Sequence, residues 1–215
     1  MFKNRTAQLI LQSSYCSVGI IGIIASVGFF DFYFREDFYA HFTNLSNYFC
    51  IAVMFAELVQ TAKKKNDSYV TAVPKLKFVG LMAILLTFFV FNILLAGAPD
   101  RDPALNFKVA SVVLHVILPI MYLADWVMFY ERKTVKWYYP FLSAIFPLIY
   151  IIFIYIRAWF LDFNPNAPSI YPYFFLNLET LGVQGVIRWV LLLLVGFVVG
   201  GAIILAFDKI GKSKT

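Results

Sequence analysis

The chain has 215 residues, of which 61% are hydrophobic and only 14% charged, and its mean hydropathy is +0.78. A soluble domain carries about a quarter charged residues, so this composition excludes an ordinary water-soluble fold and indicates a protein that uses the lipid bilayer as its solvent. The net charge of +6 does not indicate a nucleic-acid partner, because the basic residues lie at the ends of apolar runs.

Six apolar runs follow one another along the chain, each long enough to cross a hydrocarbon core of about 30 Å as a helix. Strands of a membrane barrel would need only about 10 residues and would alternate in polarity. The expected spans are residues 7–30, 40–62, 77–97, 106–130, 137–160 and 185–207. The sequence therefore predicts an all-α fold in which residues 1–215 form a single domain, a polytopic membrane bundle of six transmembrane helices.

The distribution of basic residues predicts the orientation of this bundle. If the N-terminus lies in the cytoplasm, the outer side holds only five of the 18 basic residues, namely Arg35, Arg101, Lys108, Arg157 and Arg188. The positive-inside rule then places both termini in the cytoplasm and makes the chain a multi-pass protein of the cell membrane. The long outer segment 161–184 is rich in Pro, Asn and aromatic residues, and we expect it to act as a lid.

Several polar residues lie inside the apolar runs at similar depth. Thr43 follows Asp37 by six residues and His115 follows Lys108 by seven, which places both roughly 9–10 Å below the outer surface. Asn92, on the third span, lies roughly 12 Å below the same surface. Because polar groups are costly in lipid, we expect these side chains to face the bundle interior and to converge there.

These residue types permit a specific chemistry. A threonine hydroxyl becomes a useful nucleophile when a neutral imidazole takes its proton, which makes Thr43 and His115 candidate catalytic residues. Amide side chains can stabilise the oxyanion that such an attack produces, and the candidates are Asn44, Asn47 and Asn92. The alternative is structural: Thr43 bonds to its own helix and His115 completes a packing network.

Four charged residues near the ends of the spans have two interpretations each. Glu57 and Asp125 lie at matching depth on the inner side, where they either meet Lys or Tyr side chains from the inner segments or form a proton path. Arg157 and Arg188, near the outer ends of the last two spans, either bind a substrate carboxylate or lipid phosphate or extend to the headgroups.

No cofactor and no metal are expected. Two histidines on different spans and two cysteines inside apolar runs supply too few ligands at a suitable spacing for a metal ion. The sequence also lacks a Walker loop, a dinucleotide fingerprint and a GxSxG elbow.

Three segments in order among the six spans carry a family resemblance: FTNLSNYF at 42–49, LHVILPIMYLADWVMF at 114–129 and IYPYFFLNLETLG at 170–182. The chain resembles the androgen-induced-gene and androgen-dependent TFPI-regulating protein family, and is most similar to its bacterial six-helix relatives. The resemblance implies intramembrane hydrolysis of fatty acid esters of hydroxy fatty acids. Thr43 matches the family's threonine nucleophile and His115 its histidine, while the pair Tyr171-Pro172 matches a structural motif before the last helix.

Three functional hypotheses follow. The first is an intramembrane hydrolase of lipid esters in a bacterial plasma membrane, with a lipid substrate reaching Thr43 from the outer leaflet. The second is a lipid-binding or carrier protein without catalytic activity, in which the polar residues line a headgroup cavity. The third is a proton-coupled transporter that uses Glu57 and Asp125. The sequence predicts no oligomeric state.

Overall fold

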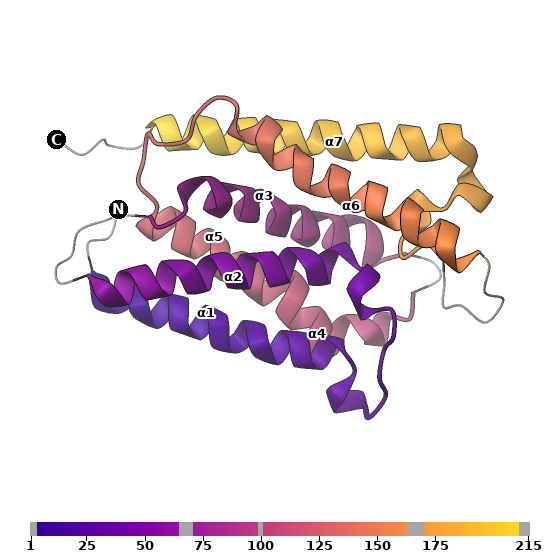
Figure 1. The fold of residues 1–215 in the computed structure, drawn as a ribbon, viewed down its shortest axis with the longest axis horizontal. Helices are drawn as coiled ribbons and strands as arrows, with labels where there is room; N and C mark the ends of the chain where they lie inside the picture. Colours follow the sequence, from indigo (N-terminus) through magenta and orange to yellow (C-terminus); the bar gives the residue numbers. More distant parts are fainter. Residues whose placement is uncertain (1–3, 65–70, 99–100, 163–169, 211–215) are drawn as a thin grey trace.

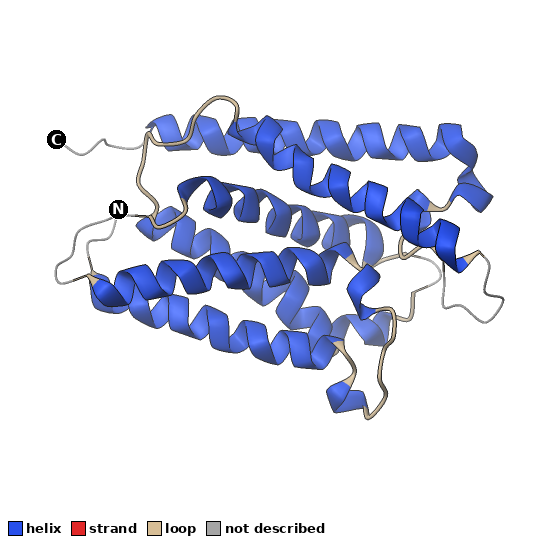
Figure 2. Cartoon of the chain, in the orientation of Figure 1, coloured by secondary structure: helices blue, strands red, loops and turns tan. Residues whose placement is uncertain are grey.

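The computed structural model describes residues 4–64, 71–98, 101–162 and 170–210, and these residues form helices and loops without any strand (Figure 2). Six helical segments are long and apolar enough to cross a membrane, which indicates a multi-pass membrane protein. The helices are α1 Arg5–Ser26, α2 Phe42–Lys63, α3 Pro74–Val90 with its extension η3 Phe91–Leu95, the continuous series α4 Val109–Val112, η5 Val113–Ile117 and α5 Leu118–Phe129, then α6 Tyr139–Leu161 and α7 Leu178–Ile210.

The long helices lie side by side along the long axis of the molecule (Figure 1). Helix α3 occupies the centre, where it packs against α2, α5 and α6, and α1 packs against α2 and α5. Helix α7 lies at one edge and contacts mainly α6, so most of its apolar surface remains exposed, as suits a helix that faces lipid. Because the number of spans is even, α1 begins and α7 ends at the same end of the bundle (Figure 1).

The first span is shorter than the sequence predicts. Helix α1 ends at Ser26 and not at residue 30, because Gly28 adopts a left-handed conformation with φ of 90°. A side chain there would collide with the backbone oxygen of Tyr33, so only glycine fits this close turn. The chain then forms the short 3₁₀ turn η1, Phe29–Asp31, and η2, Phe38–Ala40, before entering α2.

The last span begins earlier than predicted. Helix α7 starts at Leu178 and not at residue 185, with a break at Gly182, where φ is 61° and ψ is 174°. The predicted lid at 161–184 is therefore partly helical, since it also contains the 3₁₀ turn η6, Phe174–Leu176. Residues 163–169 of that expected lid lie outside the described residues.

Candidate functional site

The structure brings Thr43 and His115 into contact. Thr43 lies in the first turn of α2, whose N-cap is His41, and His115 lies in the middle of η5. The distance between Thr43 Oγ1 and His115 Nε2 is 3.1 Å, which is a hydrogen bond. Both side chains lie near the end of the bundle where α1 ends and α2 begins, and Thr43 is buried. A hydroxyl and an imidazole at this distance can exchange a proton.

The second ring nitrogen of His115 determines which way that proton can move. Nδ1 lies 2.9 Å from the carbonyl oxygen of Ser111, one turn earlier in the same helix. A carbonyl oxygen only accepts hydrogen bonds, so Nδ1 carries the hydrogen, and in the neutral imidazole Nε2 is then an unprotonated acceptor. The Thr43 hydroxyl donates to this acceptor. His115 is therefore oriented to act as a base toward Thr43.

The helix around His115 is not a regular α-helix, and Pro119 explains why. Residues Val113–Ile117 form a π-helix, in which the Leu118 N–H donates to the Val113 carbonyl five residues earlier. The next such bond would run from residue 119 to the carbonyl of Leu114, but proline has no N–H. The π-helical segment therefore leaves the Leu114 carbonyl without a backbone donor.

Asn47 provides the missing donor. Its Nδ2 donates to the Leu114 carbonyl at 3.2 Å and to the Thr43 carbonyl at 2.7 Å. The amide thereby joins the backbone of α2, at Thr43, to the backbone of η5, next to His115. Both amide hydrogens are used in these bonds, so Asn47 holds the two helices in register and does not serve as an oxyanion donor, the role that the sequence suggests for it.

A second π-helical segment faces the first. Residues Phe91–Leu95 continue α3 as a π-helix, which ends where the Ala96 N–H bonds to the Phe91 carbonyl at 2.7 Å. The Phe91 ring stacks on the His115 imidazole, with ring centroids 3.7 Å apart and planes inclined by 19°. This contact, which the sequence gives no signal for, fixes the plane of the imidazole. Two π-helical segments side by side mark a region where backbone geometry is adjusted to a site.

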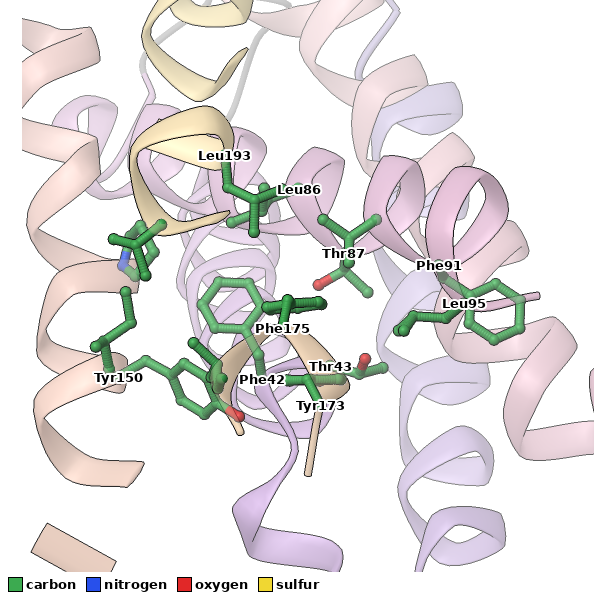
Figure 3. A pocket seen from close by; sticks show the side chains of 15 residues that line it. Phe42, Thr43, Leu86, Thr87, Phe91, Leu95, Tyr150, Tyr173, Phe175 and Leu193 are labelled. Carbon is green, nitrogen blue, oxygen red and sulfur yellow. The ribbon is translucent and has the colours of Figure 1, made fainter. Parts of the chain in front are cut away.

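Two cavities meet at Thr43. A large one, of about 1000 Å³, is lined by polar and charged residues, including His115, Asn44 and Arg101, together with a similar number of apolar residues. A small one, of about 70 Å³, is lined almost wholly by apolar and aromatic side chains from α2, α3, α6, η6 and α7 (Figure 3). Thr43 lines both cavities, so it lies between an apolar space and one that also contains charged and polar groups.

Tyr173 is a site residue that the sequence analysis missed. It lies next to Thr43 at the small cavity (Figure 3) and lines both cavities. Burial raises the pKa of its phenol. The phenol therefore remains protonated at neutral pH and can donate a hydrogen bond. The only signal for it in the sequence is its position directly after the pair Tyr171-Pro172.

Of the remaining oxyanion candidates, Asn44 lies at the site and Asn92 does not. Asn44 lines the large cavity and donates through Nδ2 to the Phe38 carbonyl, which leaves its second amide hydrogen available. Asn92 is exposed and donates to the Phe88 carbonyl of its own helix at 2.8 Å. It lies in η3 directly after Phe91, and because Phe91 faces His115, the next side chain around the helix points away from the site.

The two arginines proposed from sequence line neither cavity. Arg157 is buried, donates through Nη1 to the Ile170 carbonyl at 2.8 Å, and lies 5.6 Å from the centre of the Tyr39 ring. It therefore joins α6 to the outer segments on either side. Arg188 is exposed on α7. Neither is placed to contact a substrate held at Thr43.

The inner acids form a separate cluster. Lys77 Nζ lies 2.5 Å from Asp125 Oδ2 and 3.7 Å from Glu57 Oε2, and all three side chains are almost completely buried. Gln12 donates to Asp125 Oδ1 at 3.3 Å, and the Val73 N–H donates to Glu57. The two acids therefore meet a lysine, as the first of their two interpretations predicts, and this lysine lies in the first turn of α3. Among the described residues, no group of His, Cys, Asp and Glu could hold a metal ion.

A scan of protein-family models and searches of curated proteins and of solved structures find no match to this chain. An assignment of function therefore rests on the geometry of the site and on the resemblance of its short motifs.

Proposed function

We propose that this protein is an intramembrane hydrolase of lipid esters in which Thr43 is the nucleophile and His115 the general base. The observation that carries the proposal is the 3.1 Å contact between Thr43 Oγ1 and an imidazole whose other nitrogen is committed to the Ser111 carbonyl. This is the arrangement of a nucleophile, a base and a group that orients the base. The resemblance to the threonine hydrolase family supports the same two residues.

The reaction would proceed in two acyl-transfer steps. Thr43 Oγ1 attacks the ester carbonyl carbon while Nε2 of His115 takes the hydroxyl proton, and a tetrahedral oxyanion forms. The Tyr173 phenol and the free amide hydrogen of Asn44 are the donors placed to stabilise it. Collapse breaks the bond to the alcohol, which leaves with the proton from Nε2. Water then loses a proton to Nε2 and attacks the acyl-Thr43 ester, releasing the acid and restoring the Thr43 hydroxyl.

The two cavities support an amphiphilic substrate. The small apolar cavity has room for a short segment of hydrocarbon next to Thr43, and the rest of a long chain would extend between the helices into lipid. The large cavity would admit polar groups and the water that the second step consumes. A fatty acid ester of a hydroxy fatty acid, the substrate class that the resemblance implies, has both parts.

We further propose that both termini are cytoplasmic and that the protein lies in a bacterial plasma membrane. The concentration of basic residues at the end of the bundle where α1 begins and α7 ends supports this orientation. The large cavity would then open on the outer side, so the substrate would enter from the outer leaflet.

The test compares purified variants in detergent on a panel of lipid esters. Thr43→Val, which keeps the shape of the side chain and removes the hydroxyl, should lower the release of fatty acid at least a hundredfold and abolish labelling by a fluorophosphonate probe. Thr43→Ser should retain activity and labelling, because it keeps a hydroxyl. His115→Gln should lose activity to a similar extent as Thr43→Val, since the two side chains act as a unit.

Thr180→Val is the matched control, since Thr180 is an exposed threonine at the start of α7. It should behave like the wild type. Equal activity or labelling in Thr43→Val and Thr180→Val would refute the catalytic assignment. Retention of an ester lipid by the wild type, with no release of acid above the rate without protein, would identify a lipid-binding protein and overturn the proposed hydrolase.

A further inference from the structure

Arg101 is a cation at the proposed catalytic site, and none of the described carboxylates forms an ion pair with it. It lines the large cavity together with His115 and Thr43. Its guanidinium carbon lies 5.1 Å from the centre of the Phe91 ring, the same ring that stacks on the His115 imidazole. A single aromatic side chain therefore contacts both the general base and the arginine. An anion bound to Arg101 would lie in the cavity that Thr43 and His115 also line.

The position of this guanidinium is fixed by neighbouring groups. Arg101 Nε donates to Asn106 Oδ1 at 2.6 Å, and Asn106 Nδ2 donates to the Ala96 carbonyl at the end of η3 at 2.8 Å. The Arg101 backbone N–H donates to the Ala98 carbonyl at 3.0 Å. With Nε occupied, the two terminal nitrogens Nη1 and Nη2 remain as a planar pair of donors. Such a pair matches the two oxygens of a carboxylate.

The other charges of the cavity leave Arg101 without an acidic partner. Asp31 is held by Lys108 at 3.0 Å and by Arg35 at 2.9 Å, and Asp102 accepts from the Ala104 N–H as a helix cap. Asp37 also lines the cavity. Within the described parts of the chain, no carboxylate lies within ion-pair distance of Arg101.

Partial burial also lowers the pKa of the Arg101 guanidinium, the direction expected for a cation that has lost water and gained no anion. A bound carboxylate would reverse this loss of solvation. The cavity lining holds three acids and, with Arg101 included, three bases, so a singly charged anion disturbs this balance less than a doubly charged phosphate.

We infer that Arg101 binds a free carboxylate of the substrate, so that the site selects lipids carrying an ionised acid in the same molecule as the scissile ester. The substrate part of this inference rests on the proposed hydrolase function, whereas binding of a carboxylate at Arg101 does not. Arg101 thereby becomes a specificity-determining residue: it does not take part in bond breaking but holds the substrate so that its ester reaches Thr43.

The experiment measures a ratio within each variant. One arm determines the affinity of detergent-solubilised protein for a long-chain fatty acid and for its methyl ester, by displacement of a bound fluorescent fatty acid. The second arm determines kcat/KM for a fatty acid ester of a hydroxy fatty acid and for the methyl ester of its carboxyl group. The variants are Arg101→Gln, Arg101→Lys and the matched control Arg188→Gln, whose arginine is exposed on α7 and lines neither cavity.

The wild type and Arg188→Gln should prefer the free acid over the methyl ester by about ten- to a hundredfold, which is the factor in affinity that a charge-assisted hydrogen-bonded pair usually contributes. In Arg101→Gln the ratio should fall to about one in both arms, and in Arg101→Lys it should be intermediate, since the charge remains and the paired donors are lost. Because the ratio compares two ligands of the same protein sample, a partly unfolded preparation does not change it.

An unchanged ratio in Arg101→Gln would overturn the inference while leaving the hydrolase proposal intact. The opposite failure is also distinguishable: a wild type that cleaves no ester but distinguishes acid from methyl ester through Arg101 would refute the hydrolase and keep the carboxylate subsite. An alkyl phosphate that binds more tightly than the fatty acid, in a manner that requires Arg101, would assign the subsite to phosphate and overturn the choice of a carboxylate.

Discussion

Replacement of Lys77 by methionine should strongly destabilise the bundle. Methionine matches the length of much of the lysine side chain, so the change removes the ammonium group and little volume. Lys77 is 1% exposed, and its Nζ contacts both Asp125 and Glu57. Without it, two carboxyl groups remain buried among apolar side chains with no cation beside them.

The size of the effect follows from the loss of this shared partner. Removing one member of a buried ion pair costs about 3–5 kcal/mol, because the remaining charge has lost both water and its counter-ion. Lys77 serves two acids, so we expect Lys77→Met to fall at the upper end of that range. The measurement is the free energy of unfolding in mixed detergent micelles, followed by the loss of helical circular dichroism.

Lys75→Met provides the matched control, since Lys75 lies two residues away in the same helix and is exposed. It should change the free energy of unfolding by no more than about 0.5 kcal/mol. A combined Lys77→Met, Glu57→Gln and Asp125→Asn variant should recover most of the loss, because no charge remains buried. Equal stability of Lys77→Met and Lys75→Met would refute the view that the three charges are interdependent.

Three further predictions concern the outer half of the bundle. Asn47→Leu leaves the Leu114 carbonyl without a donor and should lower the free energy of unfolding by about 1–3 kcal/mol, measured in the same micelles. A change below about 0.5 kcal/mol would contradict the bridging role of Asn47. Tyr173→Phe should lower kcat about a hundredfold with little change in KM, and an unchanged kcat would exclude its phenol as an oxyanion donor. Hydrogen bonding to Lys108, with a smaller contribution from Arg35, lowers the pKa of Asp31. The ion pairs of Asp31 should therefore persist at neutral pH and break only as the pH falls through that lowered pKa. Lys108→Met should raise the pKa of Asp31 in carboxyl NMR titrations.

The number and order of the helices could be predicted from the sequence because a membrane helix leaves a long, unambiguous apolar run. Their ends were less predictable. The first helix stops at Ser26 although the apolar run continues, because Gly28 permits a turn that depends on contact with Tyr33. The apolar residues beyond it remain exposed, and hydropathy does not distinguish such residues from the helix itself.

The contact of Thr43 with His115 could be anticipated because depth below the surface can be counted in residues along each helix. Rotation about the helix axis cannot be counted in this way when the helix departs from the α-helical repeat. Asn92 lies in such a segment, η3, and is exposed. Asn47 lies in the regular helix α2, but the Leu114 carbonyl that it bridges belongs to the π-helical segment η5, which the sequence did not predict, so both amides were given the same role. Arg101 and Tyr173 lie outside the predicted helices, where depth and periodicity carry no information.

The π-helical segment around His115 has an evolutionary consequence. A π-helical turn contains one residue more than the α-helical turn it replaces, and each residue rotates the following side chains by about 100° around the helix axis. Deletion of one codon within Val113–Ile117 would restore a regular helix of nearly the same length while turning the imidazole away from Thr43. Insertion of one codon would do the reverse. A single inserted residue thus separates a bundle in which the threonine and the histidine are in contact from one in which they are not. The rest of the fold stays in place.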